Sequence, residues 1–107
     1  MKQQLNGDQF LKVLEALSNP YRLKILAVLY KERQYVSKLA RQLGISRPLL
    51  YLHLQKLEDA ELIKGHHEIS EDGKAMKYFE LIPFSLPIDE SLIASVAESV
   101  TIKKKKE

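Results

Sequence analysis

The chain has no cysteine and no tryptophan, and glycine and proline each occur only four times in 107 residues. Without cysteine it forms neither disulfides nor thiolate zinc sites, and it has no cysteine nucleophile. The longest unbroken apolar run, residues 25–30, is far shorter than the ~20 residues that a membrane-spanning helix needs. The sequence therefore predicts a soluble, cytoplasmic protein that does not engage a membrane.

Catalytic signatures are also missing. The glycines stand singly at turn or cap positions, so there is no glycine-rich loop to hold a phosphate. No Ser/His/Asp set or pair of carboxylates has the spacing of a catalytic site. His66 and His67 are adjacent on a predicted strand, where neighbouring side chains point to opposite faces and cannot chelate one metal ion. We expect no enzyme activity, no cofactor and no metal site.

The charge is distributed unevenly along the chain. The formal net charge is only +3, but residues 20–57 hold eight basic residues and one acid, a net of +7. Residues 58–102 hold three lysines and ten acids, a net of −7, and the chain ends in the basic run Lys103–Lys106. Positive charge gathered in one third of a small domain favours binding to a phosphate backbone.

Hydrophobic periodicity predicts helices at 8–17, 21–30, 36–43, about 46–60 and 88–102. Residues 62–70 and 74–82 are predicted strands, joined by a turn at 71–73 that contains an Asp-Gly pair. The helix at 21–30 is apolar on most sides and is expected at the centre of the core. The short helix at 36–43 ends at Gly44, and Ser46 and Pro48 begin the next helix. Leu50, Leu54 and Leu57 form the buried face of that next helix.

This order of elements is typical of one architecture. Two short helices joined by residues 43–46 form a helix-turn-helix, and a hairpin directly after them forms a wing. The predicted fold is mostly α with a small β-hairpin: a winged helix-turn-helix made of two helices, the helix-turn-helix, a two-stranded wing and a C-terminal helix. Residues 1–82 are expected to form the DNA-binding domain. Residues 83–107 would form a linker, a dimerisation helix and a basic tail.

The first and last predicted helices carry apolar stripes wider than so small a domain can cover. We assign the surplus to a homodimer interface. The residues expected to contribute to it are Phe10, Leu14, Leu92, Val96 and Val100.

Three stretches of the sequence are similar to the ArsR (arsenic-repressor-like) family of winged-helix regulators. They are residues 16–26, with a proline and an arginine before an Ile-Leu helix, residues 36–48 around the helix-turn-helix, and residues 50–63 from the second helix into the wing. The resemblance implies a homodimer that binds an inverted-repeat operator, often as a repressor released by a small ligand or a metal. Here the paired cysteines that sensing members often carry near Tyr35–Leu39 are missing, and the wing tip 71–73 is acidic.

The second helix of the motif presents candidate DNA contacts. Arg47 suits a bidentate contact to guanine, and Tyr51 and Gln55 lie on the same face. Lys38 and Arg41 on the preceding helix, and Lys74 and Lys77 on the wing, suit phosphate contacts. His53 matches a histidine common in the family, and either contacts DNA or fixes the helix by an interhelical hydrogen bond. The complete predicted set is Lys38, Arg41, Ser46, Arg47, Pro48, Tyr51, His53, Gln55, Lys56, Lys74 and Lys77.

We interpret the chain as a sequence-specific regulator of transcription, a repressor that binds double-stranded DNA as a homodimer. One alternative is a chromatin-like protein that coats DNA without regard to sequence. The other is a protein–protein module that docks a partner through Leu49 and Leu52, which stand where the family more often has polar residues. The sequence leaves open whether an unknown small-molecule effector regulates the protein.

Overall fold

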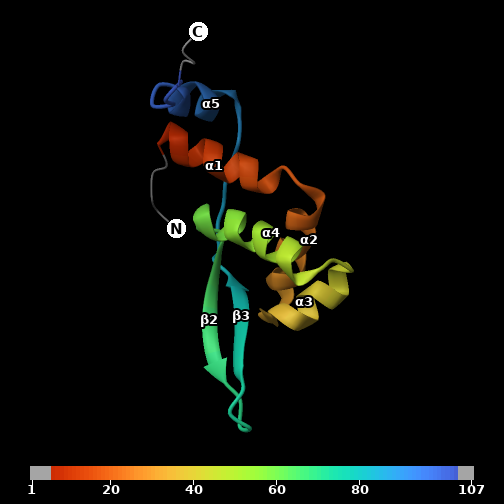
Figure 1. The fold of residues 1–107 in the computed structure, drawn as a ribbon. Helices are drawn as coiled ribbons and strands as arrows, with labels where there is room; N and C mark the ends of the chain where they lie inside the picture. Colours follow the sequence, from red (N-terminus) through yellow and green to blue (C-terminus); the bar gives the residue numbers. More distant parts are fainter. Residues whose placement is uncertain (1–5, 104–107) are drawn as a thin grey trace.

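The structure is a computed structural model that describes residues 6–103. Within these residues the helices are α1 (Gly7–Leu17), α2 (Pro20–Lys31), α3 (Val36–Leu43), α4 (Arg47–Asp59) and α5 (Glu90–Ala97). The strands are β1 (Gln34–Tyr35), β2 (Ile63–Ile69) and β3 (Ala75–Leu81). Figure 1 shows α2, α3 and α4 packed together, with the β2–β3 hairpin projecting away from them as the wing. The predicted winged helix-turn-helix fold is confirmed. The lysines at 104–106 of the predicted basic tail lie outside the described residues.

Short-range capping signals set where the helices begin and end. The side chain of Asn19 accepts hydrogen bonds from the N–H groups of Tyr21 and Arg22, and Pro20 takes the first position of α2. Ser46 Oγ accepts from the N–H of Leu49 at the start of α4. Gly44 ends α3 at φ 67°, in the left-handed region that glycine adopts without strain. These local signals fix the turn between the two helices of the motif.

The core lies between α2, α3, α4 and the base of the wing. Its fully buried large side chains are Ile25, Leu39, Leu50, Leu54, Leu57, Ile63 and Phe79. The expected buried face of α4 is therefore confirmed. The expectation that α2 lies at the centre of the core holds for one side of the helix, whose buried residues are Ile25, Leu26 and Leu29 and which packs against α1, α3, α4 and β3. The other side of α2 is uncovered, because Leu23 is 53% exposed and Tyr30 is 80% exposed.

The wing is part of a three-stranded antiparallel sheet with the order β1-β3-β2, not a two-stranded hairpin alone. Strand β1 pairs Gln34 with Phe79 and Tyr35 with Tyr78. This strand is only two residues long and depends on pairing with residues more than 40 positions away in the sequence. No local sequence pattern predicts such a pairing. The predicted turn between β2 and β3 is present, and Gly73 supplies its positive φ of 85°. The short β1 anchors the base of the wing next to α3.

Helices α1 and α5 form an arm at one end of the molecule (Figure 1). Gly7 N–H donates to Ser99 Oγ, and Asp8 accepts from both the N–H and the hydroxyl of Thr101, at 2.8 Å each. These contacts draw the chain after Ala97 across the start of α1, so α5 ends there and does not continue to residue 102 as expected. With this arm the radius of gyration is 16.4 Å, whereas a compact chain of this length has about 13 Å. Among the described residues, no helix is long and apolar enough to cross a membrane.

Candidate DNA-binding surface

Helix α4 has two opposite faces. Leu50, Leu54 and Leu57 are at most 1% exposed and point into the core. Pro48, Leu52, Gln55 and Asp59 follow one another at i, i+4, i+7 and i+11, so they line the opposite side, which we call the outer stripe. All residues of the outer stripe are exposed. The structure thus leaves one complete side of α4 free to enter a groove.

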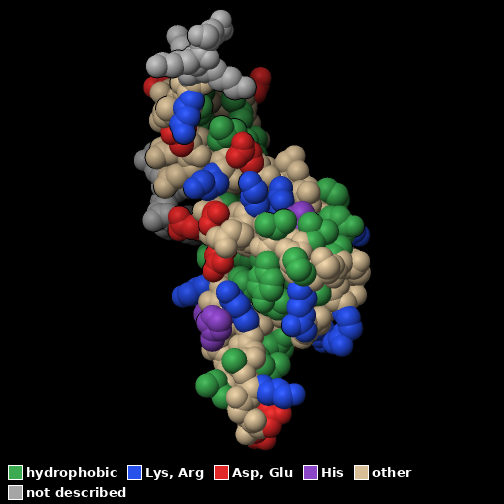
Figure 2. All heavy atoms as spheres, viewed as in Figure 1, with side chains coloured by type: hydrophobic (Ala, Val, Ile, Leu, Met, Phe, Trp, Pro, Cys, Tyr) green, Lys and Arg blue, Asp and Glu red, His purple; other side chains and the backbone are tan. Residues whose placement is uncertain are grey.

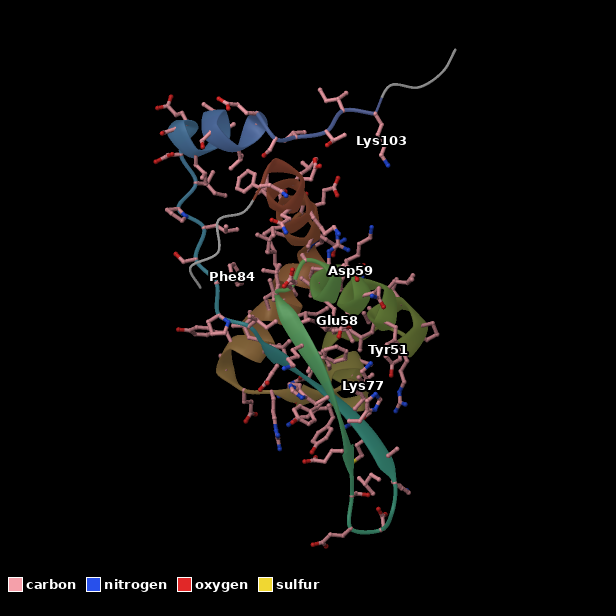
Figure 3. The ribbon with its side chains drawn as sticks, turned by 90° about the vertical axis from the view of Figure 1, so that its left-hand side faces the viewer. Tyr51, Glu58, Asp59, Lys77, Phe84 and Lys103 are labelled. Carbon is pink, nitrogen blue, oxygen red and sulfur yellow. The ribbon has the colours of Figure 1, made fainter. Side chains whose placement is uncertain are left out.

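A groove runs between the start of α4 and the wing, and we call it the wing groove. Four predicted contact residues line it: Arg47 and Tyr51 from α4, and Lys74 and Lys77 from the hairpin. Figure 3 shows Tyr51 and Lys77 on this side of the molecule. Lys77 Nζ lies 5.2 Å from the centre of the Phe79 ring, close enough for a cation–π contact that orients the lysine. Two elements distant in sequence are thus combined into one basic surface.

Other predicted contacts lie outside the lining of this groove. Lys38 and Arg41 on α3 and Lys56 on α4 are exposed, as phosphate contacts require. Ser46 is also exposed, but its hydroxyl caps α4. Gln55 Nε2 donates to Asp59 Oδ1 at 2.9 Å, which holds its amide in place on the outer stripe. The structure therefore brings four of the predicted contacts together in the wing groove and leaves most of the others exposed, with one exception.

The exception is His53, which is only 9% exposed. Its Nδ1 lies 3.1 Å from Arg22 Nη1, and its ring stacks on Tyr21 with the ring centres 5.5 Å apart. Burial, and next to it the charge of Arg22, lower the pKa of His53 below its ordinary value of 6.5. The prediction of His53 as a DNA contact is corrected, because the side chain joins α4 to α2, which was the alternative weighed from sequence.

Not every basic residue of the +7 segment is free to meet phosphate. Arg33 lies over the Tyr78 ring at 4.3 Å and 4.0 Å from the carboxylate of Glu68. Tyr35 donates its hydroxyl to the same carboxylate, and this hydrogen bond, with burial second, raises the pKa of Tyr35 above 10.0. Sequence reasoning missed this cluster because it depends on the unexpected strand β1. These contacts of Arg33 and Tyr35 with the wing hold the wing against β1, so the Arg33 side chain is already engaged within the protein.

Acidic groups lie at two places away from the wing groove. Glu58, Asp59 and the following Glu61 stand at the C-terminal end of α4, where Figure 3 labels the first two. At the wing tip, Ser70 donates to Asp72, and this bond lowers the pKa of the carboxyl group below 3.8. Figure 2 shows Lys and Arg side chains around an apolar patch in the middle of the molecule, with acidic side chains at the wing tip and at one end of α4. The positive charge in the middle of this face thus favours the binding of a polyanion.

The residues predicted to dimerise lie on the arm. Phe10 and Val96 are 4% and 9% exposed, so α1 and α5 of one chain already cover them. Leu14, Leu92 and Val100 are half-buried. Leu11 and Ile93, on the same two helices, are 42% and 43% exposed and were not expected there. Within residues 6–103 no three His, Asp or Glu side chains lie close enough together to hold a metal ion.

Comparison with known proteins identifies the family. A family model described as a helix-turn-helix domain matches residues 17–66. The uncharacterised helix-turn-helix-type transcriptional regulator MJ0229 of Methanocaldococcus jannaschii is 40% identical over 88 residues, which cover 82% of this chain and 92% of that protein. The chain belongs to the helix-turn-helix transcriptional regulators. The predictions of a DNA-binding regulator and of no enzyme activity are confirmed at this level.

Solved structures of other helix-turn-helix regulators are similar to this one. NolR from Sinorhizobium fredii is 27% identical with a TM-score of 0.57, over 84% of this chain and 79% of that one. The homodimeric winged helix-turn-helix domain of Mb0332 from Mycobacterium bovis, described as a possible ArsR-family regulator, is 23% identical with a TM-score of 0.62, over 92% and 85%. This regulator therefore has the winged helix-turn-helix fold, as its sequence predicted.

Proposed function

We propose that this regulator is a homodimeric repressor that binds an inverted-repeat operator. One α4 helix from each protomer would lie in the major groove, with half-sites ~34 Å apart. The observation that carries the proposal is the outer stripe of α4 beside the wing groove, where four predicted contacts from two elements share one basic surface. In this arrangement, phosphate contacts supply affinity and α4 supplies sequence preference.

Individual roles follow from these positions. Arg47 begins α4, where its guanidinium suits guanine O6 and N7, and Tyr51 and Gln55 extend the reading surface. Lys38 and Arg41 lie on α3, Lys56 lies on α4, and Lys74 and Lys77 lie on the wing side of the groove, so these five suit phosphate oxygens. Removing Lys77 should weaken binding to all duplexes alike, whereas removing Arg47 should relax the preference at one base position.

The arm supports the homodimer. Helix α5 packs on α1 and leaves Leu11, Ile93 and Ile88 between 42% and 51% exposed. An extended arm with exposed apolar side chains is covered when two copies associate. The similar Mb0332 domain is itself described as homodimeric. We assign dimerisation to α1 with residues 83–103, and DNA contact to the remaining helices and the wing. The repressor role rests on the ArsR-type resemblance, and the proposal includes no small-molecule effector.

The test is a titration of the protein onto the DNA upstream of its coding region. A scrambled duplex of equal length is titrated for comparison, and both titrations are repeated at several salt concentrations. The proposal predicts binding at ~150 mM salt that prefers the upstream DNA by about 10³ or more. Equal binding to both duplexes that falls steeply with salt would favour the sequence-indifferent coating protein. Binding to neither duplex would contradict the proposal and favour a protein partner for Leu49 and Leu52.

A further inference from the structure

Leu52 stands in the middle of the outer stripe of α4, between Pro48 and Gln55, and is 66% exposed. The core does not need it, because Leu50, Leu54 and Leu57 already fill the inner face of the helix. Leu49, three residues earlier, is 40% exposed and adjoins it on the helix surface. Two large apolar side chains thus lie exposed on the part of α4 that is proposed to enter the DNA groove.

A leucine side chain neither donates nor accepts a hydrogen bond. Against a polar base edge it would displace the water bound to the donors and acceptors of the base and make no hydrogen bond in its place. The major-groove edge of the common base pairs carries one apolar group, the C5-methyl of thymine. Resting on the proposed DNA binding, we propose that Leu52, supported by Leu49, recognises a thymine methyl at one position of each half-site.

The neighbouring Gln55 supports the same base composition. Its amide nitrogen gives one hydrogen to Asp59, 2.9 Å away, and keeps a second hydrogen and the amide oxygen. This remaining donor and acceptor match N7 and N6 of adenine. Leu52 and Gln55 are three residues apart on one face, so they would reach neighbouring base pairs, both of them A·T.

Surroundings of the patch favour DNA as its occupant over a protein. Arg47 lies on the same helix, and Lys38 and Arg41 lie exposed on the preceding one. A protein partner for the leucine pair would bring these three basic side chains against its own surface, whereas DNA supplies phosphates around a groove floor that holds methyl groups.

The experiment uses deoxyuridine, which differs from thymidine only by lacking the C5-methyl. Each thymine of the half-site is replaced in turn in the duplex that the upstream titration identifies. At one position, loss of the methyl should weaken binding about fourfold when one half-site is changed, and ~15-fold when both are changed. In Leu52→Ala the same replacement should have no effect, because the partner of the methyl is gone. Leu23→Ala removes another exposed leucine, on α2, which is 53% exposed against 66% for Leu52, and should keep the full penalty.

Each result has one meaning. If the protein distinguishes operator from scrambled DNA but no deoxyuridine position matters, the methyl contact is wrong and the proposed function stands. If Leu52→Ala keeps the deoxyuridine penalty, another side chain contacts the methyl and the assignment of Leu52 is wrong. If the unchanged protein binds both duplexes equally, the methyl contact falls together with the proposed function. Circular dichroism of Leu52→Ala checks that the exposed substitution leaves the fold intact.

Discussion

The guanidinium of Arg22 in α2 reaches His53 in α4, with Arg22 Nη1 3.1 Å from the imidazole Nδ1. The same guanidinium donates to the carbonyl oxygens of Ala16 at 2.7 Å and Glu15 at 3.2 Å, at the end of α1. Because arginine only donates, His53 Nδ1 accepts, so the imidazole is neutral with its proton on Nε2. One side chain thus ties α1 and α2 to the helix proposed to read DNA.

Replacing Arg22 should destabilise the protein as a whole. Arg22→Ala removes three hydrogen bonds, two of them to helix-end carbonyl groups, and should lower the free energy of unfolding by about 2–3 kcal/mol. Arg22→Lys should recover only part of this loss, because an ammonium group cannot reproduce the planar fork. Urea denaturation measures both, and Lys24→Ala, an exposed substitution on the same helix, is the matched control. A loss for Arg22→Ala no larger than for Lys24→Ala would contradict this role.

Stability should depend on pH through His53. Its pKa in the folded chain lies below the ordinary value of 6.5, chiefly because of burial. At a pH between the folded-state pKa and 6.5, the unfolded chain therefore binds more protons than the folded chain. The contribution of neutral His53 to the free energy of unfolding is complete above pH ~6.5 and is lost as pH falls, by at most about 1.4 kcal/mol per pH unit for one proton. The difference in unfolding free energy between the unchanged protein and His53→Gln, measured from pH 7.5 to 5, should shrink as pH falls. A difference that stays constant would refute the assignment.

Glu61 adopts a conformation that suits glycine. It follows α4 at φ 60°, and the N–H of Leu62 donates to the carbonyl of Leu57. This left-handed residue ends α4 in the same way that Gly44 ends α3. Glu61→Gly should therefore stabilise the chain by about 1 kcal/mol. Gly44→Ala should destabilise it by about 1 kcal/mol through backbone strain alone, since an added Cβ meets nothing within 4 Å. Thermal denaturation that shifts both variants in the same direction would contradict this explanation.

Gly7 controls the arm. A Cβ there would lie 2.3 Å from the carbonyl oxygen of Val96 and 2.6 Å from a methyl group of Val100, so α1 and the end of α5 would have to separate. Gly7→Ala should destabilise the chain by about 1–3 kcal/mol. If the arm forms the dimer, the variant should also dissociate at a higher protein concentration in sedimentation equilibrium. Lys12→Ala, exposed on the same helix, should change neither property.

The sequence predicted best where structure depends on neighbouring residues. Asn19-Pro20, Gly44 and Ser46 set helix ends through bonds within a few positions, and the structure has them as expected. Strand β1 was missed because the pairing of Gln34 with Phe79 is distant in sequence. The end of α5 was misplaced for a similar reason, since the contact of Thr101 with Asp8 spans 93 positions.

The exposed face of the candidate DNA-binding surface could be predicted from the sequence, but the internal contacts of its individual side chains could not. Helical periodicity placed Arg47, Tyr51 and Gln55 on the face opposite the core, and the structure leaves these side chains exposed. It left open whether His53 contacts DNA or joins two helices, because the contact with Arg22 depends on how α2 crosses α4. Nor could charge counting tell that Arg33 is held by Tyr78 and Glu68 of the wing.

The most direct test of the DNA-binding surface is an amide chemical-shift map of the protein with and without the upstream duplex. We expect the largest changes along α4 from Arg47 to Gln55 and in the wing from Lys74 to Lys77. Residues 84–86, in the linker before α5, should change little. Changes concentrated at Glu58 and Asp59 or on the exposed side of α2, with residues 47–55 and the wing unaffected, would contradict the proposed binding surface.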